Sequence, residues 1–208
     1  MSAPGGPASL KFKLIFVGEQ TVGKSALITR FVYDTFEDNY AATVGMDLLS
    51  KTIYVSDKPV RLQLWDTAGQ ERFRALIPSY FRDASVGVVC FDVTSRTSFN
   101  KVDSWVAEVR KERGSSVVVT VCGNKIDLDD KRQVTEEEAT NKVADLTSDP
   151  EAPVMYFETS AKTGAGVKEM FKHIAARLVS AGAEEQEQHG ETLQKTGEEI
   201  AGKKTCSC

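Results

Sequence analysis

Residues 12–32 read FKLIFVGEQTVGKSALITRFV, and this stretch decides how the chain folds around it. The six residues of Phe12–Val17 form an apolar run typical of a buried strand, and Lys24–Val32 has the apolar spacing of a helix. Between them, Gly18–Ser25 matches the pattern G-x-x-x-x-G-K-[ST]. A glycine-rich loop in this setting lets successive backbone N–H groups point at phosphate oxygens, and the helix N-terminus adds partial positive charge. The stretch therefore predicts a phosphate-binding loop.

Two side chains of the loop extend this prediction. Lys24 is placed to reach terminal phosphates, and Ser25 offers a hydroxyl to Mg²⁺. A magnesium nucleotide is implied, although the loop alone does not choose between ATP and GTP. The alternative is an ordinary Gly-rich turn between a strand and a helix, which the full pattern disfavours.

Short apolar runs alternate with helical stretches along the rest of the chain. The expected strands are Phe12–Val17, Met46–Val55, Val60–Trp65, Val86–Asp92, Val117–Gly123 and Val154–Glu158. The expected helices are Lys24–Val32, Arg74–Arg82, Ser98–Arg113, Thr135–Leu146 and Val167–Val179. This alternation predicts a three-layer α/β/α fold with a six-stranded, mostly parallel sheet. The second and third strands are separated only by Ser-Asp-Lys-Pro, so we expect one antiparallel hairpin at an edge.

Length and composition predict one domain with two flexible ends. The chain has 208 residues and a net charge of −4, which argues against nucleic-acid binding through a broad basic face. We expect a domain over residues 11–180, after an extension, residues 1–10, that does not resemble a secretory signal. A cytosolic compartment with free thiols follows, and Cys90 and Cys122 are expected in the core. Apolar runs of about six residues are too short to span a membrane.

Residues 181–208 are predicted to form a flexible tail. They carry six acidic residues and three lysines, with few large apolar side chains to offset the entropy of ordering. The alternative is a marginal, exposed helix within Glu184–Ile200, since Glu, Gln, Lys and Ala favour one.

A second motif, Asp66-Thr67-Ala68-Gly69-Gln70, follows the strand that ends at Trp65. An aspartate at a strand end can hold Mg²⁺ through water, and Gly69 allows a backbone N–H to approach a γ-phosphate. Gln70 then lies beside that phosphate. The pattern is weak alone but gains weight downstream of a phosphate loop.

The base is predicted from two later loops. Asn124-Lys125-Ile126-Asp127 follows an apolar strand, at the sheet edge where ligands of α/β proteins bind. The Asp127 carboxylate can accept from the ring N–H and exocyclic amine of guanine, a donor pair that adenine lacks. Ser160-Ala161-Lys162 offers a backbone N–H to the guanine carbonyl, although a helix-capping loop would explain it equally well by itself.

Together, in this order and spacing, these motifs and Thr43 resemble the small GTPases of the Ras superfamily across residues 11–180. The resemblance implies a switch that binds GTP or GDP with Mg²⁺ and hydrolyses GTP. Hydrolysis would be slow without an activating protein, with Gln70 orienting the attacking water. Residues 36–45 and 66–82 are the expected switch segments.

The resemblance also implies a role for each matching residue. Phe36 would stack on the guanine edge, and Thr43 would contact Mg²⁺ and γ-phosphate. Mg²⁺ would be held by Ser25, Thr43 and Asp66. The nucleotide contacts would be Gly18, Thr21, Val22, Gly23, Lys24, Ser25, Ala26, Phe36, Tyr40, Thr43, Gly69, Asn124, Lys125, Asp127, Ser160, Ala161 and Lys162.

The final residues, Cys206-Ser207-Cys208, are similar to the end of the Rab branch, in which both cysteines carry geranylgeranyl groups. Thr205 occupies the position where a C-a-a-X box needs cysteine. The alternatives are a metal or redox pair, or idle thiols. The runs from Trp65 to Asp83 look most like the sixth Rab subgroup, which works at the Golgi in vesicle transport, and another endosomal or secretory subgroup is the alternative.

Membership of this branch implies an effector surface and a set of partners. Leu48, Trp65 and Tyr80 would form the surface, and Leu48 stands where an aromatic residue is usual. The partners would be an activating protein, an exchange factor, a prenylation escort, a GDP-dissociation inhibitor and effectors, around a monomer tethered to membranes. A P-loop kinase or ATPase and an inactive GTPase-like scaffold are the competing hypotheses; Asp127 disfavours the first, and intact Lys24, Ser25, Thr43 and Gln70 disfavour the second.

Overall fold

The computed structural model describes residues 10–38, 43, 45–68, 77–114, 117–147 and 153–181, and the statements below concern these residues. The predicted N-terminal extension up to residue 9 and the tail beyond residue 181 lie outside them. So do Tyr40, Gly69, Gln70, Cys206 and Cys208.

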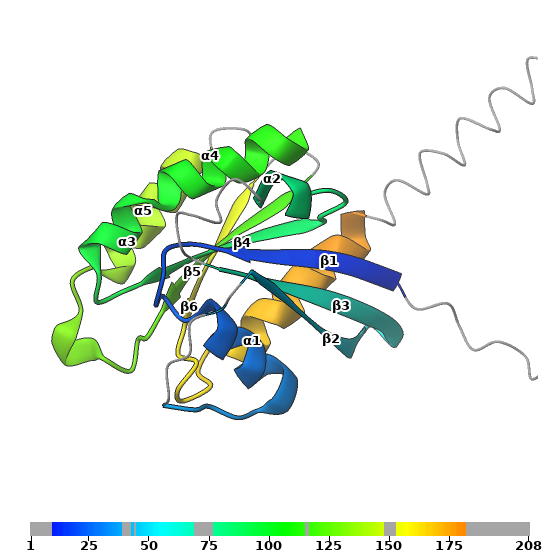
Figure 1. The fold of residues 1–208 in the computed structure, drawn as a ribbon, viewed down its shortest axis with the longest axis horizontal. Coiled ribbons are helices and arrows are strands. Elements are labelled where there is room, and N and C mark those ends of the chain that lie inside the picture. The colour runs from blue at the N-terminus through cyan, green and yellow to red at the C-terminus, as the bar shows by residue number, and fades with distance from the viewer. Residues whose placement is uncertain are drawn as a thin grey trace, which may run out of the picture.

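One six-stranded sheet forms the centre of the molecule, with the strand order β2-β3-β1-β4-β5-β6 (Figure 1). The strands are β1 (Leu10–Val17), β2 (Met46–Val55), β3 (Lys58–Thr67), β4 (Val86–Asp92), β5 (Val118–Asn124) and β6 (Val154–Thr159). Only the β2–β3 pair is antiparallel; the other four pairings are parallel. The predicted sheet and its edge hairpin are confirmed.

The hairpin is tighter than the sequence indicated. Val55 pairs with Lys58, so the loop contains only Ser56 and Asp57. Both have positive φ, at 48° and 61°, as a two-residue turn of type I′ requires.

Helices cover both faces of the sheet (Figure 1). They are α1 (Lys24–Tyr33), α2 (Ile77–Tyr80), α3 (Arg96–Asn100), α4 (Val102–Arg113), α5 (Glu136–Leu146), a 3₁₀ turn η3 (Asp129–Lys131), and a helix over residues 167–181. On one face, Leu27 and Phe31 of α1 pack with Phe171 of the last helix. On the other, Trp105 of α4 packs with Val143 of α5. The three-layer α/β/α arrangement is thereby confirmed.

Two predicted helices have different limits. The single helix expected over residues 98–113 is divided into α3 and α4 at Lys101, and α3 begins early because the Ser95 side chain accepts from the N–H of Ser98. The helix expected over residues 74–82 is helical at Ile77–Tyr80 and ends in a turn at Asp83, whose φ is 59°. Residues 74–76 lie outside the described chain.

The buried cysteines were predicted correctly. Cys90 and Cys122 are paired neighbours on β4 and β5, 1% and 0% exposed, and both are free thiols. A hydrogen bond to Cys122, together with burial, raises the pKa of Cys90, so it is a neutral core residue. No helix within the described ranges is long and apolar enough to cross a membrane.

Candidate nucleotide-binding site

The loop at Gly18–Ser25 connects β1 to α1 and can follow its path only with glycine at two positions. Gly18 has φ of 136°, and a Cβ there would lie 2.2 Å from the carbonyl oxygen of Cys90. Gly23 has φ of 94°, and its Cβ would lie 2.4 Å from the side-chain nitrogen of Asn124. The loop is therefore packed closely against β4 and against the residue that ends β5.

Lys24 lies beneath this loop and is 6% exposed. Its Nζ donates to the carbonyl oxygens of Gly18 and Glu19, both at 2.9 Å. Burial lowers the pKa of Lys24, whereas the nearby Cys90, Asp66 and Glu19 oppose that shift. The ammonium group is held inside the loop, where an anion would relieve its desolvation.

Ser25, Thr43 and Asp66 meet at the end of the loop. Thr43 Oγ1 lies 2.8 Å from Ser25 Oγ and donates to Asp66 Oδ2 at 3.1 Å, and Ser25 Oγ donates to the same carboxylate oxygen. The other oxygen, Oδ1, is buried and has no hydrogen-bond partner among the residues that the structure describes. Burial raises the pKa of Asp66, so its charge is poorly compensated by the protein alone.

This oxygen set fits Mg²⁺. The described chain has no group of three or more His, Cys, Asp or Glu that could hold a metal, but Mg²⁺ does not need one. It takes oxygen ligands and is usually bound through one or two carboxylates together with waters and substrate phosphates. The unpartnered Asp66 oxygen beside two hydroxyls has the chemistry that such an ion would complete.

Asn124 joins the phosphate loop to the two later loops. Its side chain is 1% exposed and donates from Nδ2 to the carbonyl of Val22 at 2.9 Å. Its Oδ1 accepts from the Ala161 N–H at 3.2 Å and from the Thr159 hydroxyl at 3.3 Å. Three segments predicted to contact one ligand are thus bonded through one amide.

Asp127 and Lys125 are also held in defined positions. The Ser160 hydroxyl donates to Asp127 Oδ1 at 2.5 Å, which connects the two loops predicted to select the base. Lys125 has φ of 70°, and its Nζ lies 2.7 Å from Asp92 Oδ2. The structure therefore brings together Asn124, Asp127, Ser160 and Ala161, while Lys125 pairs with Asp92; their contacts with a base stay a prediction.

Within the described chain, two of the three backbone N–H groups of residues 160–162 donate to protein acceptors. The Ser160 N–H donates to the carbonyl of Ala165 at 2.9 Å, and the Ala161 N–H donates to Asn124. In the described chain, no acceptor is bonded to the Lys162 N–H. Lys162 is accordingly the donor of this segment left for a ligand carbonyl.

The structure also describes Phe36 and the three residues of the predicted effector surface. Phe36 is half-buried and packs on the core formed by α1 and the last helix, so its stacking on a base remains a prediction. Leu48 is 47% exposed and pairs in register with Trp65. Trp65 and Tyr80 both pack on the core beneath α4. Tyr40, Gly69 and Gln70 lie outside the described residues.

Two contacts around the site were not expected. Trp105 of α4 is buried in the core, and its Nε1 also donates to Glu19 Oε1 of the phosphate loop at 3.3 Å. Arg30 of α1 donates to the carbonyls of Ala161 and Lys162. Neither residue belongs to a short motif, so one sequence holds no local signal for these long-range contacts.

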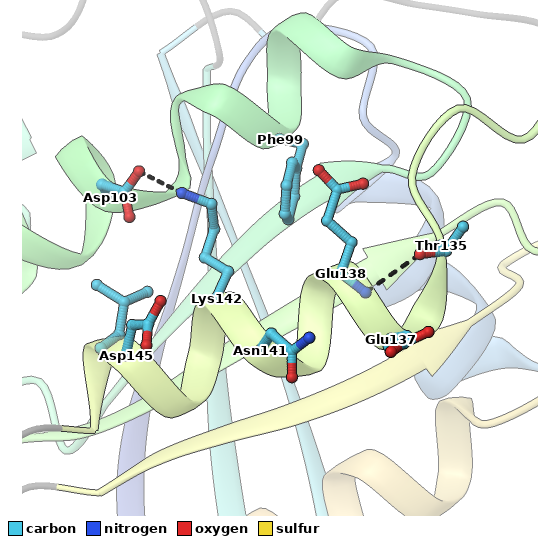
Figure 2. A pocket seen from close by; sticks show the side chains of 9 residues that line it. Phe99, Asp103, Thr135, Glu137, Glu138, Asn141, Lys142 and Asp145 are labelled. Carbon is cyan, nitrogen blue, oxygen red and sulfur yellow. Dashed lines mark hydrogen bonds and ion pairs between the residues drawn. The ribbon is translucent and has the colours of Figure 1, made fainter.

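A groove of about 540 Å³ lies elsewhere, between α3, α4 and α5 (Figure 2). Lys142 crosses it and pairs with Asp103 at 2.5 Å, and Arg96 pairs with Glu138. None of the residues predicted to contact nucleotide lines this groove. It is separate from the candidate site.

A phosphate loop between the first strand and first helix of a mostly parallel sheet defines a P-loop nucleotide-binding protein of α/β architecture. The family model described as the Ras family matches residues 13–180 of the chain. The chain belongs to the Ras family, and it is therefore a small GTPase whose class binds GTP, GDP and Mg²⁺ and hydrolyses GTP.

Proposed function

We propose that this chain is a Rab-type GTPase that cycles between GTP- and GDP-bound states to regulate vesicle trafficking, at the Golgi. The hydroxyls of Ser25 and Thr43 both donate to one carboxylate oxygen of Asp66, and this contact supports the switch part of the proposal. The Cys206-Ser207-Cys208 terminus behind a Ras-family domain carries the assignment to the Rab branch.

Thr43 is the proposed switch residue. Its hydroxyl reaches Ser25 and Asp66, although the two lie on α1 and β3 and Thr43 belongs to neither element. A γ-phosphate would supply a further acceptor at this point, and its loss on hydrolysis would weaken the hold on residues 36–45. The bound and released conformations would then present different surfaces to partners.

Catalysis is proposed to work by positioning. Phosphoryl transfer needs orientation and electrostatic stabilisation and little covalent chemistry from the protein. Gln70 would orient the attacking water, while Lys24 and the N–H groups of the loop would face the transferring phosphoryl group. Mg²⁺, when bound by Ser25, Thr43 and Asp66, would neutralise phosphate charge.

Turnover is proposed to depend on a second protein. An arginine supplied in trans accelerates Ras-type hydrolysis about 10³–10⁵-fold, and the proposed activating protein would provide it. An exchange factor would reload the site with GTP. Effectors would read the surface around Leu48, Trp65 and Tyr80, where the Lys13 ammonium lies 3.8 Å from the centre of the Trp65 ring.

The membrane anchor is proposed to consist of two lipids, on Cys206 and Cys208. One lipid chain gives only marginal membrane binding, and stable anchoring needs a second signal. The tail is acidic, with only Lys203 and Lys204 close to the cysteines, so a second chain supplies that signal better than charge. An escort protein for prenylation and a GDP-dissociation inhibitor would accompany this anchor.

The test is the location of the fluorescently tagged full chain in cells. We expect a Golgi pattern that becomes diffuse when Cys206 and Cys208 are both replaced by serine, while Ser207→Ala changes nothing. A wild-type pattern that persists in the double variant would reject the anchor. Membrane localisation away from the Golgi would retain the anchor and reject the subgroup.

A further inference from the structure

Arg30 donates to main-chain carbonyls from Nε, Nη1 and Nη2, and its Nη1 also lies 3.7 Å from Oδ1 of the Asp34 carboxylate. Nε donates to the carbonyl of Ala161 at 2.8 Å, Nη2 to that of Lys162 at 2.6 Å, and Nη1 to that of Asp34 at 2.7 Å. The side chain is only 16% exposed. A planar fork with fixed donors is suited to hold several acceptors at once.

These contacts connect three parts of the candidate site. Arg30 lies on α1, whose N-terminus is the phosphate loop. Ala161 and Lys162 belong to the loop that is bonded to Asn124 and Asp127. Asp34 caps the end of α1 and stands two residues before Phe36.

The bond to Ala161 also determines where a neighbouring donor points. The peptide between Ala161 and Lys162 is trans and planar, so its N–H points opposite to its C=O. Because Arg30 holds the Ala161 carbonyl, the Lys162 N–H is directed away from Arg30. That N–H is the donor in the segment with no acceptor in the described chain.

Other side chains fasten the same end of α1 without reaching that loop. Lys51 donates to the carbonyls of Phe31 at 2.5 Å and Val32 at 3.3 Å. Lys168 pairs with the exposed carboxylate of Asp34 at 2.8 Å. Lys51 and Lys168 therefore already hold the C-terminal end of α1. The contacts of Arg30 with residues 161 and 162 are not needed for that purpose.

We propose that Arg30 is a positioning residue for base recognition, which sets the Lys162 N–H toward the 6-carbonyl oxygen of guanine. The proposal rests on the guanine-nucleotide assignment above. Base recognition then has two separate parts. Arg30 controls the hydrogen bond to the 6-oxygen, and Asp127 accepts a hydrogen bond from the 2-amine.

The test compares dissociation rates from the full chain for three nucleotides: GDP, the 2-aminopurine ribonucleoside diphosphate, which lacks the 6-oxygen and with it the ring N1–H, and inosine diphosphate, which lacks only the 2-amine. Because the missing N1–H is the same for every protein, the rate of each nucleotide is compared between wild type and variant. In Arg30→Ala, we expect GDP to leave about tenfold faster, equivalent to about 1.4 kcal/mol of binding free energy. The analogue without the 6-oxygen should leave at nearly its wild-type rate. The ratio between GDP and inosine diphosphate should stay unchanged.

Two further variants keep this result interpretable. Lys51→Ala removes bonds from the same helix end, so it should lower the unfolding temperature and leave all three rate ratios unchanged. Arg30→Lys keeps the charge but not the fork, and it should lose part of the 6-oxygen discrimination even if Arg30→Ala fails to fold.

The proposal is overturned if the Arg30 variants accelerate all three nucleotides equally, or if Lys51→Ala reproduces their selectivity change. A wild-type chain that does not distinguish GDP from the analogue without the 6-oxygen would overturn it too, together with the base assignment. Intact wild-type discrimination with unaffected Arg30 variants would reject Arg30 alone.

Discussion

The side-chain amide of Asn124 donates to the carbonyl of Val22 at 2.9 Å, across 102 residues of sequence. Asn124 ends β5, while Val22 lies within the phosphate loop. The two halves of the candidate site are therefore not independent: the loop that would hold phosphates and the loop that would select the base share a buried hydrogen bond.

Asn124→Ala should consequently affect both binding and folding. It leaves the Val22 carbonyl and the Ala161 N–H without their partner, and each buried polar group left unpaired costs about 1–3 kcal/mol. We expect GDP to dissociate at least about tenfold faster and the unfolding temperature to fall. Asn141→Ala, an exposed Asn on α5, is the matched control and should change neither. Wild-type GDP release from Asn124→Ala would show that the bond does not support the site.

Ser25→Asn tests the metal position. The longer amide replaces a hydroxyl that touches both Thr43 and Asp66, so the arrangement that suits Mg²⁺ is lost. Binding of Mg²⁺–GTP should weaken more than binding of GDP, because GTP adds the γ-phosphate that Thr43 would contact. Ser25→Thr keeps the hydroxyl and should bind both like wild type. Equal affinities of Ser25→Asn for GTP and GDP, measured by titration, would contradict the assignment.

Gln70→Leu tests the catalytic step separately from binding. Leucine cannot hydrogen-bond the attacking water, so single-turnover hydrolysis of bound GTP should slow by about 10-fold or more, each tenfold being about 1.4 kcal/mol of barrier. GTP affinity should be unchanged. Gln63→Leu, a half-buried position on β3, should hydrolyse at the wild-type rate. An unaltered single-turnover rate in Gln70→Leu would end this role for the residue.

Asp66→Asn tests whether the buried carboxylate of the candidate site lowers the stability of the folded protein. Asp66 is 5% exposed, one of its carboxylate oxygens has no partner within the described part of the chain, and burial raises its pKa. The folded state therefore binds the Asp66 proton more tightly than the unfolded chain, so stability is lost as pH rises above the ordinary carboxylate range. With nucleotide removed and a chelator present at neutral pH, Asp66→Asn should raise the free energy of unfolding by about 1 kcal/mol.

The same substitution should weaken Mg²⁺-dependent nucleotide binding. Asp145→Asn removes an equal charge from an exposed residue on α5, and it should leave both stability and binding unchanged. Chemical unfolding followed by fluorescence would measure the difference. If Asp66→Asn unfolds more easily than wild type under chelation, the carboxylate is not destabilised as its burial indicates.

The fold could be predicted from local patterns. Phe16 and Val17, followed by Gly18 and then Lys24, place a strand, a loop and a helix in an order that few architectures use. The parallel strands could be recognised in the sequence as continuous apolar runs, because helices cover both of their faces. The division at Lys101 was missed because Phe99, Val102 and Trp105 keep the helical spacing of apolar residues across it.

The candidate site could be predicted only in part. Lys24, Asn124 and Asp127 lie in short motifs whose chemistry can be read from neighbouring residues. Arg30 and Trp105 cannot be recognised in this way, since their partners are 131 and 86 residues distant and only the folded sheet brings them together.

The central claim is that the site selects guanine nucleotides, and competition tests it most directly. The full chain, loaded with labelled GDP in the presence of Mg²⁺, would be titrated with unlabelled GTP and, separately, with ATP. We predict that GTP displaces the label at stoichiometric concentrations and that ATP in large excess does not. Displacement by ATP at concentrations equal to or lower than those of GTP would contradict the account.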